Sequence, residues 1–357
     1  MFENVENSAL NGQFKYIPFL TPANFAGLRI ARYQVCLRAE GEAAVPFFPG
    51  STLRGAFGYA LKQAVCVMNH RDCGRCLVAN QCIFPYVFET PAPSDLSILH
   101  NQRNAPHPFI IDPPIYPRGN QAVRQRILTA GEELEFGLTL MGRAIGYLPY
   151  IVYALHEMAQ RGIGKKRAKF ALVGVTALES NGIRQAIFDP VTQRLDESTD
   201  LVSDLSQLID DRLDQLLACG NDDQLNIRFA TPLRIKIQGD LQSQANFEML
   251  VRNLLRRISL LMIIHGDRKL DLDFKGLLEL ARAVEVRSSS LRWWDWGRYS
   301  ARQETVMKLG GFVGEAVFTG DRLRDFLPLI VAGELLRIGS ATSFGLGKYE
   351  LIKDNRC

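Results

Sequence analysis

The chain has 357 residues, of which 47% are hydrophobic and 22% charged, and its formal net charge is +4. This length exceeds the usual single-domain size and the apolar content can build real cores, so we expect two folded domains. No stretch approaches the roughly 18 consecutive apolar residues that cross a bilayer, and the first ten residues lack a basic segment followed by an apolar one. These features argue against a membrane protein and predict a cytoplasmic location.

Charge is unevenly distributed along the chain. Residues 1–188 hold 19 Lys and Arg against 13 Asp and Glu, residues 189–223 hold 2 against 10, and residues 224–357 hold 21 against 15. We interpret the acidic stretch as a solvated linker that marks a domain boundary. The expected organisation is therefore an N-terminal domain over 1–188, an acidic connecting segment over 189–223 and a C-terminal domain over 224–357.

Strand and helix patterns alternate in the first half. Apolar residues at helical spacing follow Ser51 and Thr52, either of which is a suitable helix N-cap. Eight prolines between residues 83 and 120 predict an irregular excursion. The predicted elements are a strand at 28–37, a helix at 52–68, a strand at 132–141, a helix at 146–161 and two strands within 169–188.

The second half repeats this alternation. Its predicted elements are a strand at 225–237 interrupted by Pro232, helices at 244–265 and 273–283, a strand-like stretch at 284–297, a helix at 322–332 and a strand at 344–352. Each half thus offers pieces of the β-α-β-β-α-β, or ferredoxin-like, plan. We expect an α+β fold of two such domains in tandem, the first with a cysteine-rich, proline-rich insertion over 66–120.

Four of the seven cysteines, Cys66, Cys73, Cys76 and Cys82, fall within seventeen residues. The two-residue gap between Cys73 and Cys76 suits two thiolate ligands on one turn, and a set of four suits zinc first and an iron–sulfur cluster second. The nearby His70 could replace one ligand. Such a closed site is structural, so no catalytic metal is expected. Unliganded cysteines, or redox use of the CGRC segment, are the alternatives.

A glycine-rich loop near the C-terminus reads GSATSFGLGK. Bare glycine N–H groups and interleaved hydroxyls allow such a loop to lie against a phosphate backbone, with Arg337 and Lys348 flanking it. A tight structural turn explains the loop equally well. The residues that could contact RNA here are Gly339, Ser340, Thr342, Ser343, Gly345, Gly347 and Lys348.

Residues 291–314 interleave basic and aromatic side chains. Flat rings stack on splayed bases while guanidinium groups bind phosphates, which is how single-stranded RNA is held. Tryptophans that fill a core beside solvated arginines are the alternative. The basic members are Arg292, Arg298, Arg302 and Lys308, and the aromatic ones are Trp293, Trp294, Trp296 and Tyr299.

His265 ends the long predicted helix just before Gly266. A helix C-terminus favours the protonated form of a histidine through the helix dipole. His265 is therefore interpreted either as a helix cap or as a catalytic group. The sequence contains no Ser/His/Asp order, no H-E-x-x-H and no paired-carboxylate pattern that would indicate another catalytic centre.

Six segments, taken in order and spacing, resemble one family. They are PGSTLRGAFG, the cysteine cluster leading into FPYVFET, TPLRIK, DWGRYSARQ, LGGFVG and GSATSFGLGKYEL. Together they resemble the CRISPR-associated endoribonuclease that processes precursor CRISPR RNA in antiviral defence. This enzyme belongs to the repeat-associated mysterious protein (RAMP) superfamily, and the resemblance is to its branch with a cysteine-rich insertion. It covers nearly the whole chain and is weakest over 189–223.

The resemblance implies two tandem ferredoxin-like, RRM-related domains and an RNA-contacting glycine-rich loop at Gly339, Gly345 and Gly347. It also implies metal-independent cleavage in which the ribose 2′-hydroxyl attacks the adjacent phosphate, leaving a 2′,3′-cyclic phosphate and a 5′-hydroxyl. Arg54 of the first motif joins the implied RNA contacts. The family's arginine-rich segment maps onto Arg298, Tyr299, Ser300, Arg302 and Gln303.

Such chemistry needs a base, a cation and an acid near the reacting phosphate. The implied catalytic residues are His265, Tyr299 and Arg337, with Tyr59 as a further base. Relatives of this branch often have a histidine two residues before the first loop glycine and a lysine directly after it. This chain has Arg337 and Ser340 there, which removes one base and one cation.

Three functions follow in order of preference. The first is the processing endoribonuclease, with CRISPR repeat RNA and crRNA as partners. The second is a non-cleaving RNA-binding subunit of a CRISPR effector complex, with the other effector subunits as partners. The third is a zinc-stabilised interaction protein that binds no RNA. Cleavage, binding without cleavage, or neither, in the presence of EDTA distinguishes the three.

Overall fold

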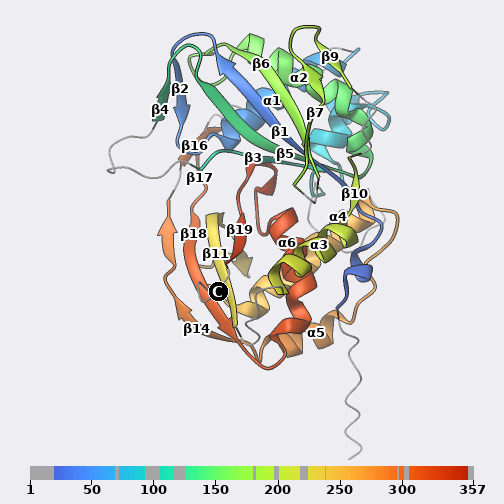
Figure 1. Ribbon diagram of the computed structural model, residues 1–357, viewed down its shortest axis with the longest axis vertical. Coiled ribbons are helices and arrows are strands. Elements are labelled where there is room, and N and C mark those ends of the chain that lie inside the picture. Colours follow the sequence, from blue (N-terminus) through green and yellow to red (C-terminus); the bar gives the residue numbers. More distant parts are fainter. Residues whose placement is uncertain are drawn as a thin grey trace, which may run out of the picture.

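A computed structural model describes residues 20–68, 72–92, 105–115, 125–179, 182–196, 201–217, 224–237, 239–295, 297–300 and 305–352. Within 297–300 and 305–308 only the backbone is described. Two α+β domains lie one above the other, each with an antiparallel sheet and helices of its own (Figure 1). No described helix is long and apolar enough to cross a membrane.

The first domain is built on a sheet of order β3-β5-β1-β6-β7. β1 is its central strand and pairs antiparallel with both β5 and β6. Helix α1 follows β1 and helix α2 follows β5, and the two helices pack against each other. The bounds are β1 Arg29–Ala39, β3 Phe109–Asp112, β5 Glu133–Met141, β6 Phe170–Leu178, β7 Arg184–Ala186, α1 Gly50–Val65 and α2 Leu148–Arg161.

The second domain repeats this plan with the sheet order β14-β18-β11-β19. In each sheet the first strand of the β-α-β-β-α-β unit lies between the fourth and the third, which confirms the expected tandem ferredoxin-like architecture. The bounds are β11 Gln224–Leu233, β14 Glu285–Ser289, β18 Gly311–Thr319, β19 Tyr349–Ile352, α4 Phe247–His265, α5 Phe274–Ala281 and α6 Leu327–Leu336.

Both domains also contain short strands outside the ferredoxin-like plan. β2 pairs with β4, β8 with β9, β12 with β13 and β16 with β17, while β10 joins β1 and β15 joins β18. Their bounds are β2 Ala43–Pro46, β4 Gln125–Leu128, β8 Phe188–Asp189, β9 Arg194–Leu195, β10 Ser203–Asp204, β12 Lys236–Ile237, β13 Asp240–Leu241, β15 Arg292–Trp294, β16 Gly297–Ser300 and β17 Thr305–Lys308.

The acidic segment is not the solvated linker that its composition predicts. Part of it forms helix α3, Leu205–Leu217, whose Leu205, Leu208 and Ile209 are buried in the core of the second domain. These residues recur at i, i+3 and i+4, so the helix is amphipathic, and it leaves Asp210 and Asp214 exposed. The high average charge conceals this periodicity.

The proline-rich stretch is also more regular than expected. It contributes β3, an edge strand of the first sheet, and a π-helical turn at Pro85–Glu89. Pro108 and Pro113 flank β3. Prolines at the two ends of an edge strand limit its length without removing the hydrogen bonds to the neighbouring strand. Helix α1 begins at Gly50, two residues earlier than predicted, and neither Ser51 nor Thr52 caps it.

Candidate functional site

The glycine-rich loop connects α6 to β19 and lies between the two domains (Figure 1). Gly345 and Gly347 have φ of +89° and +72°, which favours glycine. A Cβ on Gly347 would lie 1.7 Å from the carbonyl oxygen of Ile338, and one on Gly345 would lie 2.3 Å from Cδ of Pro113. Close backbone packing at the domain junction therefore requires both glycines.

This loop is not the open phosphate cradle that the sequence predicts. Residues 342–347 are buried, Gly339 and Lys348 are half-buried, and only Ser340 is exposed. The apolar side chains Phe344 and Leu346 alternate with the small residues and pack against Phe48 and Leu309. These two apolar residues hold the loop against the first domain, so the structural-turn alternative describes residues 342–347.

Arg337 bridges the domains instead of facing an open site. Its Nε donates to Oδ1 of Asp112 at 3.0 Å and its Nη2 to Oδ2 at 2.5 Å, and Nη1 donates to the carbonyl oxygen of Glu334. Only 8% of the Arg337 side chain is exposed. The guanidinium group is thus already engaged by a carboxylate of β3, contrary to the catalytic role expected for it.

Arg54 on α1 belongs to a second polar connection between the domains. Its Nε donates to Oγ of Ser343 at 3.0 Å, and its Nη2 donates to Nε2 of His107 at 3.0 Å. Nδ1 of His107 then faces Oγ1 of Thr90 at 2.9 Å. Burial, followed by the charge of Arg54, lowers the pKa of His107 to about 3. The expected RNA contacts Arg54 and Ser343 are therefore bonded to each other.

His265 is buried at the end of α4 with both ring nitrogens engaged. Nε2 lies 2.8 Å from the carbonyl oxygen of Pro106 and must carry the proton, while Nδ1 accepts from the hydroxyl of Tyr86 at 3.1 Å. Burial lowers the pKa of His265 to about 4, aided by Arg257 and Arg143, although the bond to Pro106 opposes the shift. The expected dipole-stabilised imidazolium is thus replaced by neutral imidazole, because desolvation outweighs the dipole.

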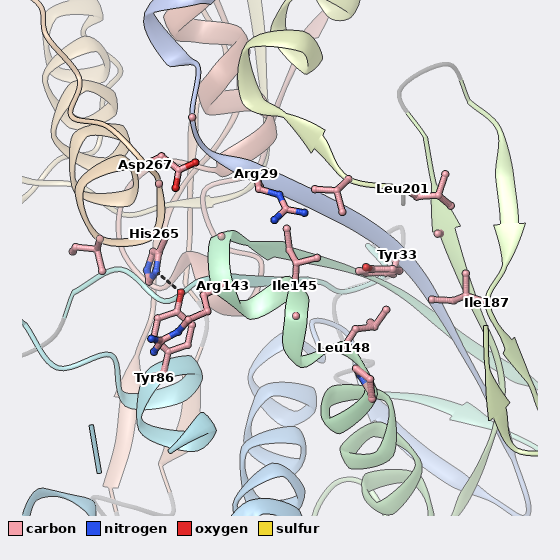
Figure 2. Close-up of a pocket in the computed structure, with 18 of the residues that line it drawn as sticks. Arg29, Tyr33, Tyr86, Arg143, Ile145, Leu148, Ile187, Leu201, His265 and Asp267 are labelled. Atoms are coloured by element: carbon pink, nitrogen blue, oxygen red, sulfur yellow. Dashed lines mark hydrogen bonds between the residues drawn. The ribbon is translucent and has the colours of Figure 1, made fainter. Parts of the chain in front are cut away.

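A cavity of about 870 Å³ opens beside His265. It is lined by the start of β1, by residues of the segment 142–149, by the turn after α4, and by Ile187, Asp196, Leu201 and Val202. Figure 2 shows His265, Tyr86 and Arg143 at one end, and Tyr33, Ile187 and Leu201 at the other. The guanidinium carbon of Arg143 lies 4.0 Å from the ring centroid of Tyr86.

Sequence reasoning singled out only His265 among the residues that line this cavity. Tyr86 falls within the FPYVFET segment. This segment carries part of the family resemblance, but its pattern does not distinguish Tyr86 from its neighbours. Arg143 lies in the turn Gly142–Tyr147 that follows β5, and Arg29 begins β1. Polar residues at strand ends were the available signal, but many such positions serve only as turns.

The aromatic and basic segment is partly structural. Trp294 packs edge-on against Phe48 at a centroid distance of 6.5 Å, and Trp293, 39% exposed, donates from Nε1 to Oδ1 of Asp295 at 2.9 Å. Arg292 is exposed on β15. Arg298 and Tyr299 lie on β16 and Lys308 on β17, with only their backbone described. Trp296 and Arg302 lie outside the described residues.

Cysteines occur at two places that bear on metal binding. Cys66, Cys73, Cys76 and Cys82 are free thiols that line one small cavity, yet in the described part of the chain no three of their sulfur atoms lie within 4.8 Å of one another. One ligand atom each from Cys36, Glu133 and Glu135 does meet that limit, so this trio could hold a metal ion.

The Cys36 trio offers a poor thiolate. Burial and the hydrogen bond to Glu133 raise the pKa of Cys36 to about 12, whereas a metal ligand must be deprotonated. Glu133 also pairs with Arg38 at 2.9 Å, and Glu135 accepts from Gln34 at 3.2 Å. Both carboxylates of the trio, on β5, therefore already have partners on the neighbouring strand β1.

Two tandem ferredoxin-like domains with a glycine-rich loop at their junction define the fold class of this protein. Residues 28–200 match a family model described as an N-terminal domain (AF_1859_N), and residues 227–349 match the model described as CRISPR-associated endoribonuclease Cas6. An uncharacterized protein of Archaeoglobus fulgidus is 22% identical over 309 residues, covering 86% of this chain and 92% of the relative.

Solved structures show the same fold. A Cas6 product complex is similar with a TM-score of 0.51 at 17% identity, over 90% of this chain and 99% of that chain. A partial Cas6-RT-Cas1–Cas2 complex is similar with a TM-score of 0.52 at 13% identity, over 93% of this chain and 47% of that chain. Residues 227–349 of the chain therefore match the Cas6 family model, and the chain shares the fold of solved Cas6 structures.

Proposed function

We propose that this protein binds CRISPR repeat RNA and cleaves precursor crRNA without a catalytic metal. The match of residues 227–349 to the Cas6 family model supports the substrate class. The observation that carries the site is the open cavity at the domain junction, where His265, Tyr86 and Arg143 meet. RRM domains bind single-stranded RNA, so a site between two RRM-related domains is suited to one RNA strand.

The proposed reaction begins when the ribose 2′-oxygen attacks the adjacent phosphorus. The bond from phosphorus to the 5′-oxygen breaks, the departing 5′-oxygen takes a proton from solvent, and solvent later removes the proton that His265 has gained. The products are a 2′,3′-cyclic phosphate and a 5′-hydroxyl. The proton of the 2′-hydroxyl passes to the Tyr86 oxygen as Tyr86 passes its own proton to Nδ1 of His265, along the 3.1 Å hydrogen bond. Arg143 beside the Tyr86 ring would stabilise the negative charge that develops on the phosphate.

A non-cleaving RNA-binding subunit is the second candidate function. Two observations favour it: both ring nitrogens of His265 are hydrogen-bonded, and Arg337 is held by Asp112. A histidine whose pKa is lowered to about 4 is also a weak base at neutral pH. In this alternative the domain junction holds RNA and another protein supplies the cut.

Cleavage of 5′-labelled repeat RNA by purified protein in EDTA tests the proposal. The proposal predicts one cut that leaves a 2′,3′-cyclic phosphate, and His265→Ala should slow it by at least about 10²-fold with RNA binding retained. His156→Ala, at a half-buried histidine on α2, is the matched control. Full activity of His265→Ala would move the base elsewhere. Binding without any cut by the parent protein would favour the second candidate.

We also propose that Cys66, Cys73, Cys76 and Cys82 hold a structural zinc ion. All four line one small cavity as free thiols, and a closed set of four thiolates suits zinc. Because no three of these sulfur atoms lie within 4.8 Å of one another, binding would have to draw them together. An iron–sulfur cluster is the alternative. Elemental analysis should find one zinc per chain, and Cys73→Ser should lower both the metal content and the melting temperature. A parent protein without bound metal contradicts the site.

A further inference from the structure

The cavity beside His265 has cationic and apolar walls at different places. Arg29 reaches over it from β1, Arg143 lies at the Tyr86 end, and Leu148 and Leu201 lie away from that end (Figure 2). Its volume of about 870 Å³ lies within the range of roughly 300 to 1,000 Å³ that is typical of ligand pockets. This division of charge and apolar surface resembles the division within a nucleotide.

Both guanidinium groups are available to an anion. Arg29 and Arg143 are exposed, and among the described residues neither has a carboxylate oxygen within 4.0 Å. Guanidinium groups bind phosphate through paired, charge-assisted hydrogen bonds. The cavity also contains the carboxylates Asp196 and Asp267, which reject a purely anionic ligand but can accept hydrogen bonds from ribose hydroxyls or exocyclic amines.

The apolar wall fits a base and not a sugar or a phosphate. Ile145, Leu148 and Leu201 are half-buried and line the cavity with the more deeply buried Ile187. An unpaired base that is splayed out of its strand can be enclosed between apolar side chains, whereas a base inside a duplex cannot reach such a pocket.

From these contacts we infer that the cavity encloses one unpaired nucleotide of the bound RNA. Its phosphate lies at Arg29 and Arg143, its base lies against Ile145 and Leu201, and Asp267 accepts from a ribose or base donor. This inference rests on the proposed function and adds a position in the RNA strand that must be single-stranded. It predicts that pairing this nucleotide in a hairpin stem weakens binding.

Titration of fluorescent single-stranded repeat RNA with the full chain tests the inference. The double variant Arg29→Gln, Arg143→Gln should weaken binding by about 10-fold to 100-fold and should reduce the slope of log K against log salt by roughly 1 to 2. Arg184→Gln, an exposed arginine on β7, is the matched control. A purely structural role of the two arginines would leave the salt slope unchanged.

Filling the cavity provides an independent test. Ile145→Trp should weaken RNA binding at least about 10-fold by excluding the base, whereas Ile127→Trp, at an exposed position on β4, should bind as the parent does. Equal melting temperatures of the two variants show that both fold. Binding by Ile145→Trp and by the double arginine variant at the parent's affinity would overturn the inference.

Two further outcomes separate the inference from the proposed function. If the parent protein binds and cuts repeat RNA and all cavity variants behave like it, RNA cleavage is retained as the function, but the nucleotide site in the cavity and the role proposed for Arg143 are both lost. A parent that binds no repeat RNA overturns both. Adenosine 5′-monophosphate alone is the second probe. If the double arginine variant loses affinity for adenosine 5′-monophosphate but keeps the parent's affinity for RNA, the cavity is a site for a free nucleotide and the inference is wrong.

Discussion

The domain junction has one side that is closed to ligands and one side that is open to them. On one side the glycine-rich loop is closed, with residues 342–347 buried against the first domain and Arg337 held by Asp112. On the other side the cavity beside His265 is open and lined by arginines, tyrosines and aliphatic residues. The segment with the clearest motif therefore joins the domains, whereas the open surface comes from residues without a motif.

This difference separates two uses of the same chemical groups. A glycine can leave its backbone N–H group open to a ligand, and it can also let other backbone atoms approach closely. Gly347 serves close backbone packing. Arginines that bind phosphate also bind carboxylate, and Arg337 does the latter. The surroundings decide which use applies, so four perturbations of the junction are informative.

The largest expected effect is from Gly347→Val. The new side chain would have to occupy φ of +72° with its Cβ 1.7 Å from the carbonyl oxygen of Ile338, so we expect a loss of more than about 4 kcal/mol in the free energy of unfolding. Urea denaturation measures it. Gly41→Ala, where no atom lies within 4 Å of the new Cβ, should change stability by less than about 1 kcal/mol. A stable, folded Gly347→Val would show that the loop is open.

Arg337→Met should have the next largest effect. Removing one partner of a buried ion pair leaves Asp112 uncompensated, which costs about 3 to 5 kcal/mol. The matched control is Arg228→Met, whose pair with Glu350 has side chains 52% and 36% exposed and should contribute only about 0 to 1 kcal/mol. Equal losses in the two variants, measured by urea denaturation, would contradict the bridging role of Arg337.

Acid should destabilise the junction through its two buried histidines. The pKa values of His265 and His107 fall from 6.5 to about 4 and about 3, so the unfolded chain binds more protons than the folded one below pH 6.5. Stability is therefore complete above pH 6.5 and falls as the pH drops toward 4, by roughly 1.4 kcal/mol per pH unit for each histidine. His265→Gln should show a shallower decline in urea midpoint between pH 7 and pH 5. An unchanged decline would mean that His265 is solvated.

Ser340→Ala should have the smallest effect. Ser340 is the one exposed residue of 339–348, so its hydroxyl can still meet a phosphate, and its loss should weaken RNA binding by about 1 kcal/mol. Stability should change by less than about 0.5 kcal/mol. Fluorescence titration with repeat RNA measures the first effect, with Ser343→Ala as the buried comparison. Loss of folding in Ser340→Ala would contradict its exposed position.

Periodicity predicted most of the fold, because the alternation of apolar residues in β5 and the helical spacing in α4 are local. It failed for α3, because the buried Leu205, Leu208 and Ile209 lie among acidic residues. It also failed for β3, because this short strand has a proline at each end. The sequence predicted that His265 ends the long helix, as it does in α4, but predicted the wrong protonation state for it. Helix dipoles are local and visible in a sequence, whereas the burial that lowers the pKa of His265 depends on Tyr86 and Pro106, which are far away in the chain.

The most direct measurement is photo-crosslinking of single-stranded repeat RNA that carries 4-thiouridine, with the crosslinked peptides identified by mass spectrometry. If RNA lies on the open side of the junction, crosslinks should map to residues 142–149 and to the turn at 264–267, which line the cavity. Crosslinks confined to the outer faces of α1 and α2, with none in these two segments, would contradict an RNA site at the domain junction.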